Sequence, residues 1–370
     1  GDGYKFPRML DFLNALDANP SAINAAFLCG HTTLRVGAME DLKRAATDNE
    51  ISRMRDNLGE ALDAGAIGLS TGLAYEPAEP APTSEVLALA EMLGPVNALY
   101  TTHLRNESDD IISSLEEAFQ IGRESNATVV LSHHKVTGQE NYGRSEETLE
   151  LIDRVRKEQR VELDVYPYVA GSTVLAKWRL AEARRVLITW SVPEPSASGR
   201  DLSEIAEEWG CSEEDACDRL QPAGAIYFMM DEADVRRIIK YPHSMIASDG
   251  LPHDQHPHPR LWGTFPRVLG HYSRDLGLLE LEDAIHRMTG KPAEVFGLSG
   301  HGEIREHYLA NLVIFDPKTI IDTADFENPT SAASGIDSVF VNGTVVWNNG
   351  VATEARPGRT IRRQNQEVSA

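Results

Sequence analysis

Short apolar runs alternate with amphipathic segments along most of the chain. Between the runs, apolar residues recur three and four positions apart and predict helices at 51–65, 84–93, 110–125 and 146–159. The runs themselves predict six strands, at 25–31, 66–72, 98–103, 128–134, 161–168 and 244–250. Strands that alternate with helices in this way are typical of a parallel sheet covered by helices. The pattern therefore predicts an α/β fold.

The alternation changes in two places. Residues 175–241 contain two strand-like runs and two helix-like segments, and we interpret them as an insertion before the last strand. After a helix predicted over 279–298, the chain turns to short β segments with Asn-Gly pairs at 342–343 and 349–350, which favour tight hairpin turns. We therefore expect a main α/β barrel at 1–304 and a small β-sandwich appendage at 305–370.

Composition narrows the class of protein. The 370 residues are 41% apolar, which is ample for one large barrel core. A net charge of −22 repels phosphate backbones, so nucleic acid is not an expected partner. The three cysteines lack CxxC spacing, no apolar stretch reaches the roughly 18 residues that span a bilayer, and the start shows no signal-peptide pattern. We expect a cytoplasmic protein with no membrane partner. Nothing in the sequence indicates the oligomeric state.

Three side chains with metal or proton chemistry stand at predicted strand ends. They are His103, His133 and Asp249. Because the carboxyl ends of barrel strands converge on one rim, two imidazoles there could share a zinc ion. Asp249 could then act as a general base and acid in hydrolysis. The alternatives are hydrogen-bonded structural histidines and an Asp-Gly turn.

Other histidines compete for the metal. His134 adjoins His133, but alternation along a strand places His133 and Lys135 on one side and His134 on the other. We therefore choose His133. A loop with histidines at 253, 256 and 258 is also a candidate, although its three prolines favour a rigid rim loop.

The motifs together resemble those of a known family. They are FLCGHTTLR, GAIGLSTGLAYEP, TTHLRNE, LSHHKVTG, DVYPYVAGST, ASDGLPHDQHPHPRLWGTFPRVLG, NLVIFDP and VFVNGTVVW. In this order, over nearly the whole chain, they resemble the D-aminoacylases, the N-acyl-D-amino-acid deacylases of the amidohydrolase superfamily. The resemblance implies a metal-dependent TIM (β/α)8 barrel that hydrolyses a small N-acyl-D-amino acid.

The resemblance also implies roles for single residues. It implies one zinc held by His103, His133 and a cysteine, an optional second metal site, and Asp249 as the base. Tyr75 would polarise the scissile carbonyl together with the metal. The substrate α-carboxylate would bind Lys135, Tyr166, Ser172 and Arg260. Arg179 lies where relatives that act on N-acyl-D-glutamate carry arginine, so we lean toward that substrate.

Some features depart from this family. No His-x-His pair precedes His103, and Cys29 falls on what would be the third barrel strand rather than the second. We therefore expect that the first two barrel strands are missing from the chain. Two alternatives stay open: another amidohydrolase, such as a cyclic-amide hydrolase or dipeptidase, and an inactive truncated barrel that only binds or assembles.

Overall fold

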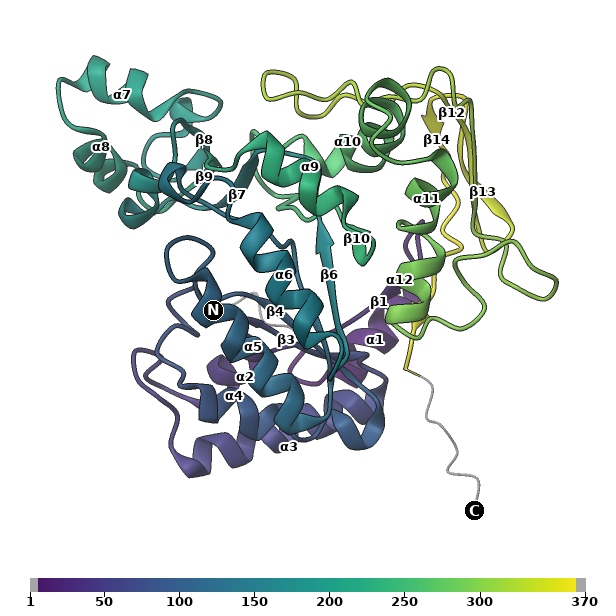
Figure 1. Ribbon diagram of the computed structural model, residues 1–370, viewed down its shortest axis with the longest axis horizontal. Coiled ribbons are helices and arrows are strands. Elements are labelled where there is room, and N and C mark those ends of the chain that lie inside the picture. Colours follow the sequence, from purple (N-terminus) through teal and green to yellow (C-terminus); the bar gives the residue numbers. More distant parts are fainter. Residues whose placement is uncertain (1–5, 364–370) are drawn as a thin grey trace.

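The computed structural model describes residues 6–363, and its centre is a parallel sheet (Figure 1). In the described chain this sheet has six strands in the order β10–β6–β5–β4–β3–β2, with β2 and β10 at its edges. Each predicted strand region contributes one strand to this sheet, so the parallel α/β prediction is confirmed. The strands are β2 (Cys29–Gly30), β3 (Gly68–Gly72), β4 (Leu99–His103), β5 (Thr128–Leu131), β6 (Val161–Val165) and β10 (Ser244–Ile246).

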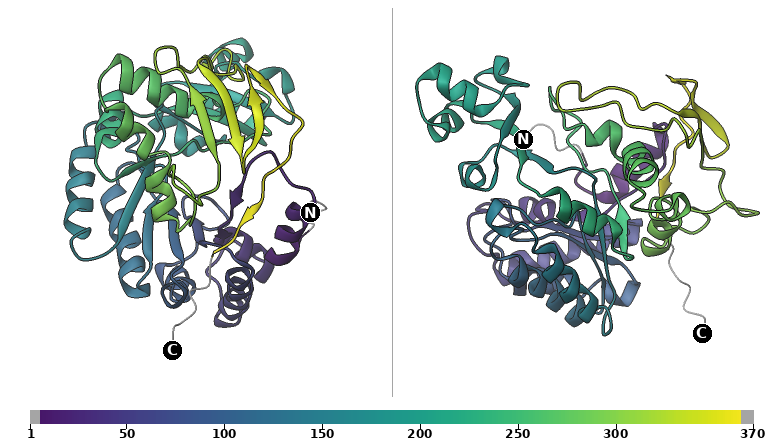
Figure 2. Two further views of the ribbon diagram at one scale, coloured as in Figure 1. Left: turned by 90° about the vertical axis from the view of Figure 1, so that its right-hand side faces the viewer. Right: turned by 45° about the horizontal axis from the view of Figure 1, so that its top comes forward.

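Helices that connect the strands pack side by side in chain order (Figure 2). The 17-residue helix after β2 shows why the sequence forms them. It begins with a capping box between Thr47 and Glu50 and ends at Gly65, whose φ of 110° suits glycine. Its buried side chains, Met54 and Leu58 among them, recur at helical spacing. The helices are α2 (His31–Ala38), α3 (Asp48–Ala64), α4 (Thr83–Ala90), α5 (Ile111–Ser125), α6 (Ser145–Val155) and α9 (Glu232–Lys240).

The register of the sheet brings the strand ends to one rim. Gly72 pairs with His103, and Thr102 pairs with Leu131, so the segments that follow β3, β4 and β5 begin side by side. Close packing of β3 on β4 depends on Gly68, because a Cβ there would lie 2.2 Å from the carbonyl oxygen of Leu99. The rim is thus built on a tightly packed part of the sheet.

A small antiparallel sheet projects from this rim after β6. Its strand order is β7–β9–β8, and two helices pack against each other beside it. The strand-like and helix-like segments predicted within 175–241 are confirmed, whereas β7 was not predicted. The elements are β7 (Ala170–Val174), η3 (Lys177–Glu182), β8 (Val186–Ser191), η4 (Pro195–Ala197), α7 (Leu202–Trp209), α8 (Glu213–Leu220) and β9 (Ala223–Phe228).

The single helix predicted over 279–298 is wrong. Two short helices, α11 (Leu281–His286) and α12 (Gly290–Val295), occupy this region instead. A continuous helix would place the ring of Pro292 against the carbonyl group four residues earlier and would lose one backbone hydrogen bond. The proline is accommodated because a new helix begins just before it. The preceding helical segments are α10 (Arg260–Arg267) and the π-helix η5 (Val268–Asp275).

The C-terminal part of the described chain is an antiparallel sheet with the order β11–β12–β13–β14. Asn342 and Asn349 both have positive φ, followed by Gly343 and Gly350, so both predicted Asn-Gly turns are confirmed. The described residues show one sheet here, and a second sandwich layer stays a prediction. The strands are β11 (Leu312–Phe315), β12 (Ile336–Val341), β13 (Thr344–Asn348) and β14 (Val351–Ala352).

The two ends of the described chain meet. The short strand β1 (Ala25–Ala26) pairs in parallel with β15 (Thr360–Ile361), and α1 (Met9–Ala18) lies nearby, packed on α3. None of the helices in the described residues combines the length and apolar character that crossing a membrane requires.

Candidate metal and substrate site

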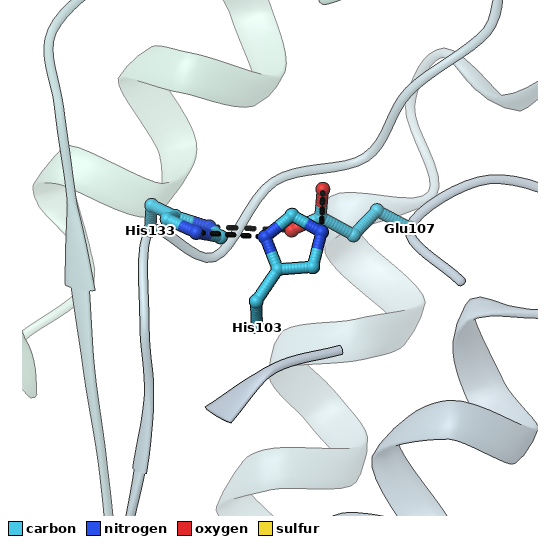
Figure 3. A group of neighbouring side chains, drawn as sticks. All are labelled: His103, Glu107 and His133. Atoms are coloured by element: carbon cyan, nitrogen blue, oxygen red, sulfur yellow. Dashed lines mark hydrogen bonds and ion pairs between the residues drawn. The ribbon is translucent and has the colours of Figure 1, made fainter. Parts of the chain in front are cut away.

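The imidazole of His103 lies between the ring of His133 and the carboxylate of Glu107 (Figure 3). His103 Nδ1 is 2.9 Å from His133 Nε2, and its Nε2 is 3.5 Å from Glu107 Oε2. The second carboxylate oxygen of Glu107 is 3.3 Å from His133 Nδ1. One ligand atom from each residue lies within 4.8 Å of the others, which makes this group a candidate metal site.

Local structure explains how these side chains meet. His103 is the last residue of β4, whereas His133 stands in a turn after β5 with a φ of 41°. This left-handed conformation is costly for a non-glycine residue. The carboxylate of Asp164 on β6 accepts a 2.7 Å hydrogen bond from the backbone N–H of His133 and so holds the turn. Backbone strain at a candidate functional residue is consistent with a role in binding.

His133 and His134 point to different places, as predicted. The Nζ of Lys135 is 2.6 Å from His133 Nδ1 and 2.5 Å from Glu107 Oε1. His134 Nε2 instead contacts Thr148 Oγ1 on α6, 3.0 Å away, and burial lowers its pKa to about 4. His133 and Lys135 therefore lie on one side and His134 on the other, as predicted. Alternation along a strand is not the cause, because residues 132–133 form a turn.

The electrostatics of the group favour cation binding. Burial is the main cause that lowers the pKa of His103 well below its ordinary value, so its ring is neutral and has a free lone pair. Burial would raise the pKa of Glu107, but neighbouring groups, the Lys135 ammonium among them, hold it well below its usual range. Two imidazoles and one carboxylate are a donor set that suits zinc.

His103 Nε2 gives a further test of fit, since it is buried without a hydrogen-bond partner in the described chain. A metal ion bound there would satisfy it. None of the three cysteines belongs to the group, and burial raises the pKa of the Cys29 thiol to about 12. The residues present therefore fit a divalent cation through His103, Glu107 and His133.

A second group forms around Arg260, the first residue of α10. Its guanidinium is 3.0 Å from the carboxylate of Asp249, donates to the backbone oxygen of Ser172 at 3.2 Å, and lies 4.7 Å from the ring centre of Tyr166. Arg260 is only 2% exposed, whereas the side chain of Asp249 is 38% exposed and its φ is 58°. The structure thus joins Asp249 to the predicted carboxylate-binding residues rather than to the two histidines.

Tyr75 connects the two groups to the antiparallel sheet. It lies in the turn after β3, its ring centre is 5.1 Å from that of His103, and its hydroxyl accepts a hydrogen bond from Thr173 Oγ1 on β7. Burial raises the pKa of Tyr75, so the hydroxyl keeps its proton and can donate it in a hydrogen bond. Tyr75 thus places a hydrogen-bond donor beside His103.

Arg179 lines a small cavity together with His103, Glu107 and Glu182. It is 4% exposed, its guanidinium stacks on Trp178 at 4.2 Å, and its Nε has no hydrogen-bond partner in the described chain. Arg179 is therefore a buried side chain next to the metal group, and not a solvent-facing lid residue.

The alternative histidine cluster has structural contacts. His256 Nε2 contacts the backbone oxygen of Phe326, His258 is buried against Ala170, and His253 is largely exposed. The three do not form a metal-binding group in the described residues. Glu107, by contrast, was missed. Its signal was the spacing, because it follows His103 by four residues in TTHLRNE.

Comparisons with known proteins identify the family and several relatives of the chain. The model of the amidohydrolase family matches residues 112–347. A D-aminoacylase of Alcaligenes xylosoxydans xylosoxydans is 55% identical, covering 98% of this chain and 75% of that protein. From the same organism, an N-acyl-D-aspartate deacylase is 50% identical, covering 97% of this chain and 72% of that protein. An N-acyl-D-glutamate deacylase is 45% identical, covering 98% of this chain and 74% of that protein.

Solved structures extend the likeness to the fold. A crystal structure of D-aminoacylase superposes with a TM-score of 0.96 at 54% identity, over 98% of this chain and 77% of that one. N-acyl-D-glutamate deacylase from Bordetella bronchiseptica, complexed with zinc and a phosphonate inhibitor, gives a TM-score of 0.94 at 45% identity, over 98% and 76%. The predicted fold class, the barrel type of these enzymes, is confirmed.

Proposed function

The chain belongs to the amidohydrolase family, and we propose that it is a zinc-dependent hydrolase that releases a D-amino acid from an N-acyl-D-amino acid. The relatives act on substrates of this kind by name, and one related structure contains zinc. We further propose that one zinc binds tightly and that a second site is possible, since another related structure concerns a binuclear centre.

One observation supports this function above the others. Four buried polar atoms near the two groups find no hydrogen-bond partner within residues 6–363: His103 Nε2, Ser172 Oγ, Arg179 Nε and Arg260 Nε. Each such group costs about 1–3 kcal/mol if it stays unpaired. A metal ion and a substrate with carboxylate groups would satisfy them, and that is the chemistry of an N-acyl amino acid.

We propose that Arg260, Lys135 and Ser172 hold the substrate α-carboxylate beside Tyr166. Arginine presents a planar fork of N–H groups that matches a carboxylate, and Lys135 adds a buried cation. The metal, when bound, would polarise the scissile carbonyl and activate water. Tyr75 would donate its hydroxyl proton in a hydrogen bond to the developing oxyanion. Asp249 pairs with Arg260 in this structure. Once the substrate carboxylate takes its place on Arg260, Asp249 would accept a proton from the attacking water and transfer it to the departing nitrogen.

Arg179 is the basis for a preference for acidic side chains. A buried guanidinium with a free N–H stabilises a carboxylate nearby, so we propose N-acyl-D-glutamate as the preferred substrate. Overall identity to the D-aminoacylase is higher than to the N-acyl-D-glutamate deacylase. Identity averages over the whole chain, however, whereas a few pocket residues set side-chain specificity.

The test measures zinc per chain by elemental analysis and hydrolysis of three substrates: N-acetyl-D-glutamate, its L-enantiomer and N-acetyl-D-methionine. We expect about one zinc per chain, turnover of the D-enantiomer only, and the highest kcat/KM for D-glutamate. Absence of both zinc and turnover would contradict the proposed function and would favour an inactive barrel. Hydrolysis of hydantoin instead, with a KM that Arg260→Ala leaves unchanged, would favour a cyclic-amide hydrolase.

Arg179→Leu tests the specificity separately. We expect kcat/KM for N-acetyl-D-glutamate to fall about 30-fold or more, while that for N-acetyl-D-methionine changes little, because only the former loses a charged hydrogen bond. Arg219→Leu is the matched control. Arg219 on α8 lies over the ring of Trp209 on α7, beside the same antiparallel sheet, but its side chain is exposed. Equal losses on both substrates would contradict the preference.

A further inference from the structure

We propose that His258 is a positioning residue, which holds Arg260 in place for the substrate α-carboxylate through its backbone. The inference rests on the proposed function, and it concerns a histidine outside the candidate metal group of the described residues. His258 lies in the loop between β10 and α10, two residues before Arg260, and is 1% exposed.

The two ring nitrogens of His258 have different partners. Nε2 is 2.9 Å from the backbone oxygen of Ala170, so it must carry the hydrogen and donate. Nδ1 accepts a 3.0 Å hydrogen bond from the backbone N–H of Arg260. Only one tautomer of the neutral ring satisfies both contacts. Burial, followed by the charge of Arg260, lowers the pKa of His258 well below its ordinary value, in keeping with a neutral ring.

The surroundings of the ring restrict its movement. The ring meets Tyr168 and Phe326 edge to face, with both centroids 5.1 Å away. Pro257 and Pro259 flank it in the sequence and restrict the backbone on both sides. Packing and backbone together therefore fix the direction in which Nδ1 accepts.

The anchor point of His258 explains why this matters for the substrate. Ala170 and Ser172 both lie on β7, two residues apart. His258 joins Ala170 to the backbone of Arg260, while the guanidinium of Arg260 donates to the oxygen of Ser172. The bond to Ala170 thus selects the tautomer in which Nδ1 accepts from the backbone N–H of Arg260, and this second bond holds the start of α10 so that the arginine side chain reaches Ser172.

Two substitutions separate the two hydrogen bonds. In His258→Asn the short amide can still accept from the N–H two residues later, as asparagine does in Asx turns, but it cannot reach Ala170. In His258→Gln the longer amide can reach Ala170 but is poorly placed to accept from Arg260. His256→Gln is the matched control, because His256 lies in the same loop and its ring packs on Gly199 and hydrogen-bonds to the backbone oxygen of Phe326, not to Arg260 or β7.

The assay compares the preferred N-acetyl-D-amino acid with its carboxamide, which has no carboxylate for Arg260. For His258→Gln we expect KM for the acid to rise about tenfold with kcat within about threefold, and the preference for acid over carboxamide to fall about tenfold. His258→Asn and the control should keep wild-type preference. Equal effects in the Asn and Gln variants, or equal losses on acid and carboxamide, would mean a merely structural role and would overturn the proposal.

Crystal structures of the zinc-loaded Asn and Gln variants test the same idea without activity. The Arg260 guanidinium should stay on Ser172 in the Asn variant and leave it in the Gln variant, and an unchanged position in both would overturn the proposal. A wild-type enzyme that hydrolyses no N-acetyl-D-amino acid would instead refute the proposed function. The structural measurement would still decide the role of His258.

Discussion

Replacing Glu85 by glutamine should weaken the whole fold. Glu85 lies on α4, is 1% exposed, and accepts hydrogen bonds from His31 Nε2 at 3.0 Å, from Arg35 at 2.5 Å and from the backbone N–H of Ala46 at 2.9 Å. Arg35 in turn donates to the backbone oxygen of Pro77, in the segment that carries Tyr75. The carboxylate therefore organises three parts of the chain.

The size of the effect follows from the pKa of Glu85. Burial would raise this pKa, but the hydrogen bonds from His31 and Arg35 outweigh burial and lower it from 4.5 to about 2. At 1.36 kcal/mol per unit, the shift stabilises the folded protein by about 3 kcal/mol. Because the folded pKa is the lower one, this contribution is complete above pH 4.5 and is lost as the pH falls toward 2. Removing one partner of a buried ion pair costs a similar amount, about 3–5 kcal/mol.

Thermal unfolding followed by circular dichroism measures the loss. At pH 7 we expect the Tm of Glu85→Gln to fall by about 4 °C, because the unfolding entropy scales with the 370 residues of the chain. At pH 3 the wild-type advantage should shrink to about 1.4 kcal/mol, less than half. The control is Glu91→Gln, since Glu91 forms an exposed ion pair with Arg55 and should lose less than about 1 kcal/mol. A loss at pH 7 no larger than in the control, or one that does not change with pH, would refute the reasoning.

Three further predictions concern the site and the strand geometry. Asp249→Asn should lower kcat by about 100-fold or more while the zinc content stays the same, and a parallel loss of zinc would show that the residue is a ligand instead. Gly68→Ala should lower the Tm by the equivalent of about 1–3 kcal/mol, because its Cβ would lie 2.2 Å from the oxygen of Leu99, and an unchanged Tm would contradict the close packing. Asn349→Ala should cost about 1 kcal/mol by urea unfolding, because its φ is 46°, whereas Asn349→Gly should cost nearly nothing; equal values would contradict the role of the turn.

The sheet was predictable because short apolar runs bounded by polar or turn residues are typical of buried strands. All six runs became neighbours in one parallel sheet. The helix over 279–298 was mispredicted because its apolar spacing continues across Gly290 and Pro292, and the chain breaks there for a local steric reason. The strand β7 escaped prediction because its residues, AGSTV, are mostly small and show no apolar alternation.

The site was predictable where it depends on strand ends. His103 ends β4 and His133 follows β5, so parallel pairing alone brings them together. Glu107 lies in the loop between β4 and α5, and the conformation of this loop places its carboxylate next to the imidazole of His103. The contact between Asp249 and Arg260, like that between His258 and Phe326, joins segments that no periodic pattern relates. The chemical roles of these residues stay predictions.

The contacts of Phe326 have a consequence for exchanging parts between related enzymes. Phe326 lies beyond residue 304, where the sequence suggests that the appendage has begun, yet its ring packs on His258 and Phe228, and nearby Asp322 pairs with Arg267 at 3.1 Å. A chimaera that replaced everything after residue 304 would therefore also replace the ring that packs on His258, next to the proposed α-carboxylate subsite. If the proposed role of His258 holds, sequence changes in the C-terminal segment would alter substrate affinity without changing any residue of the metal group.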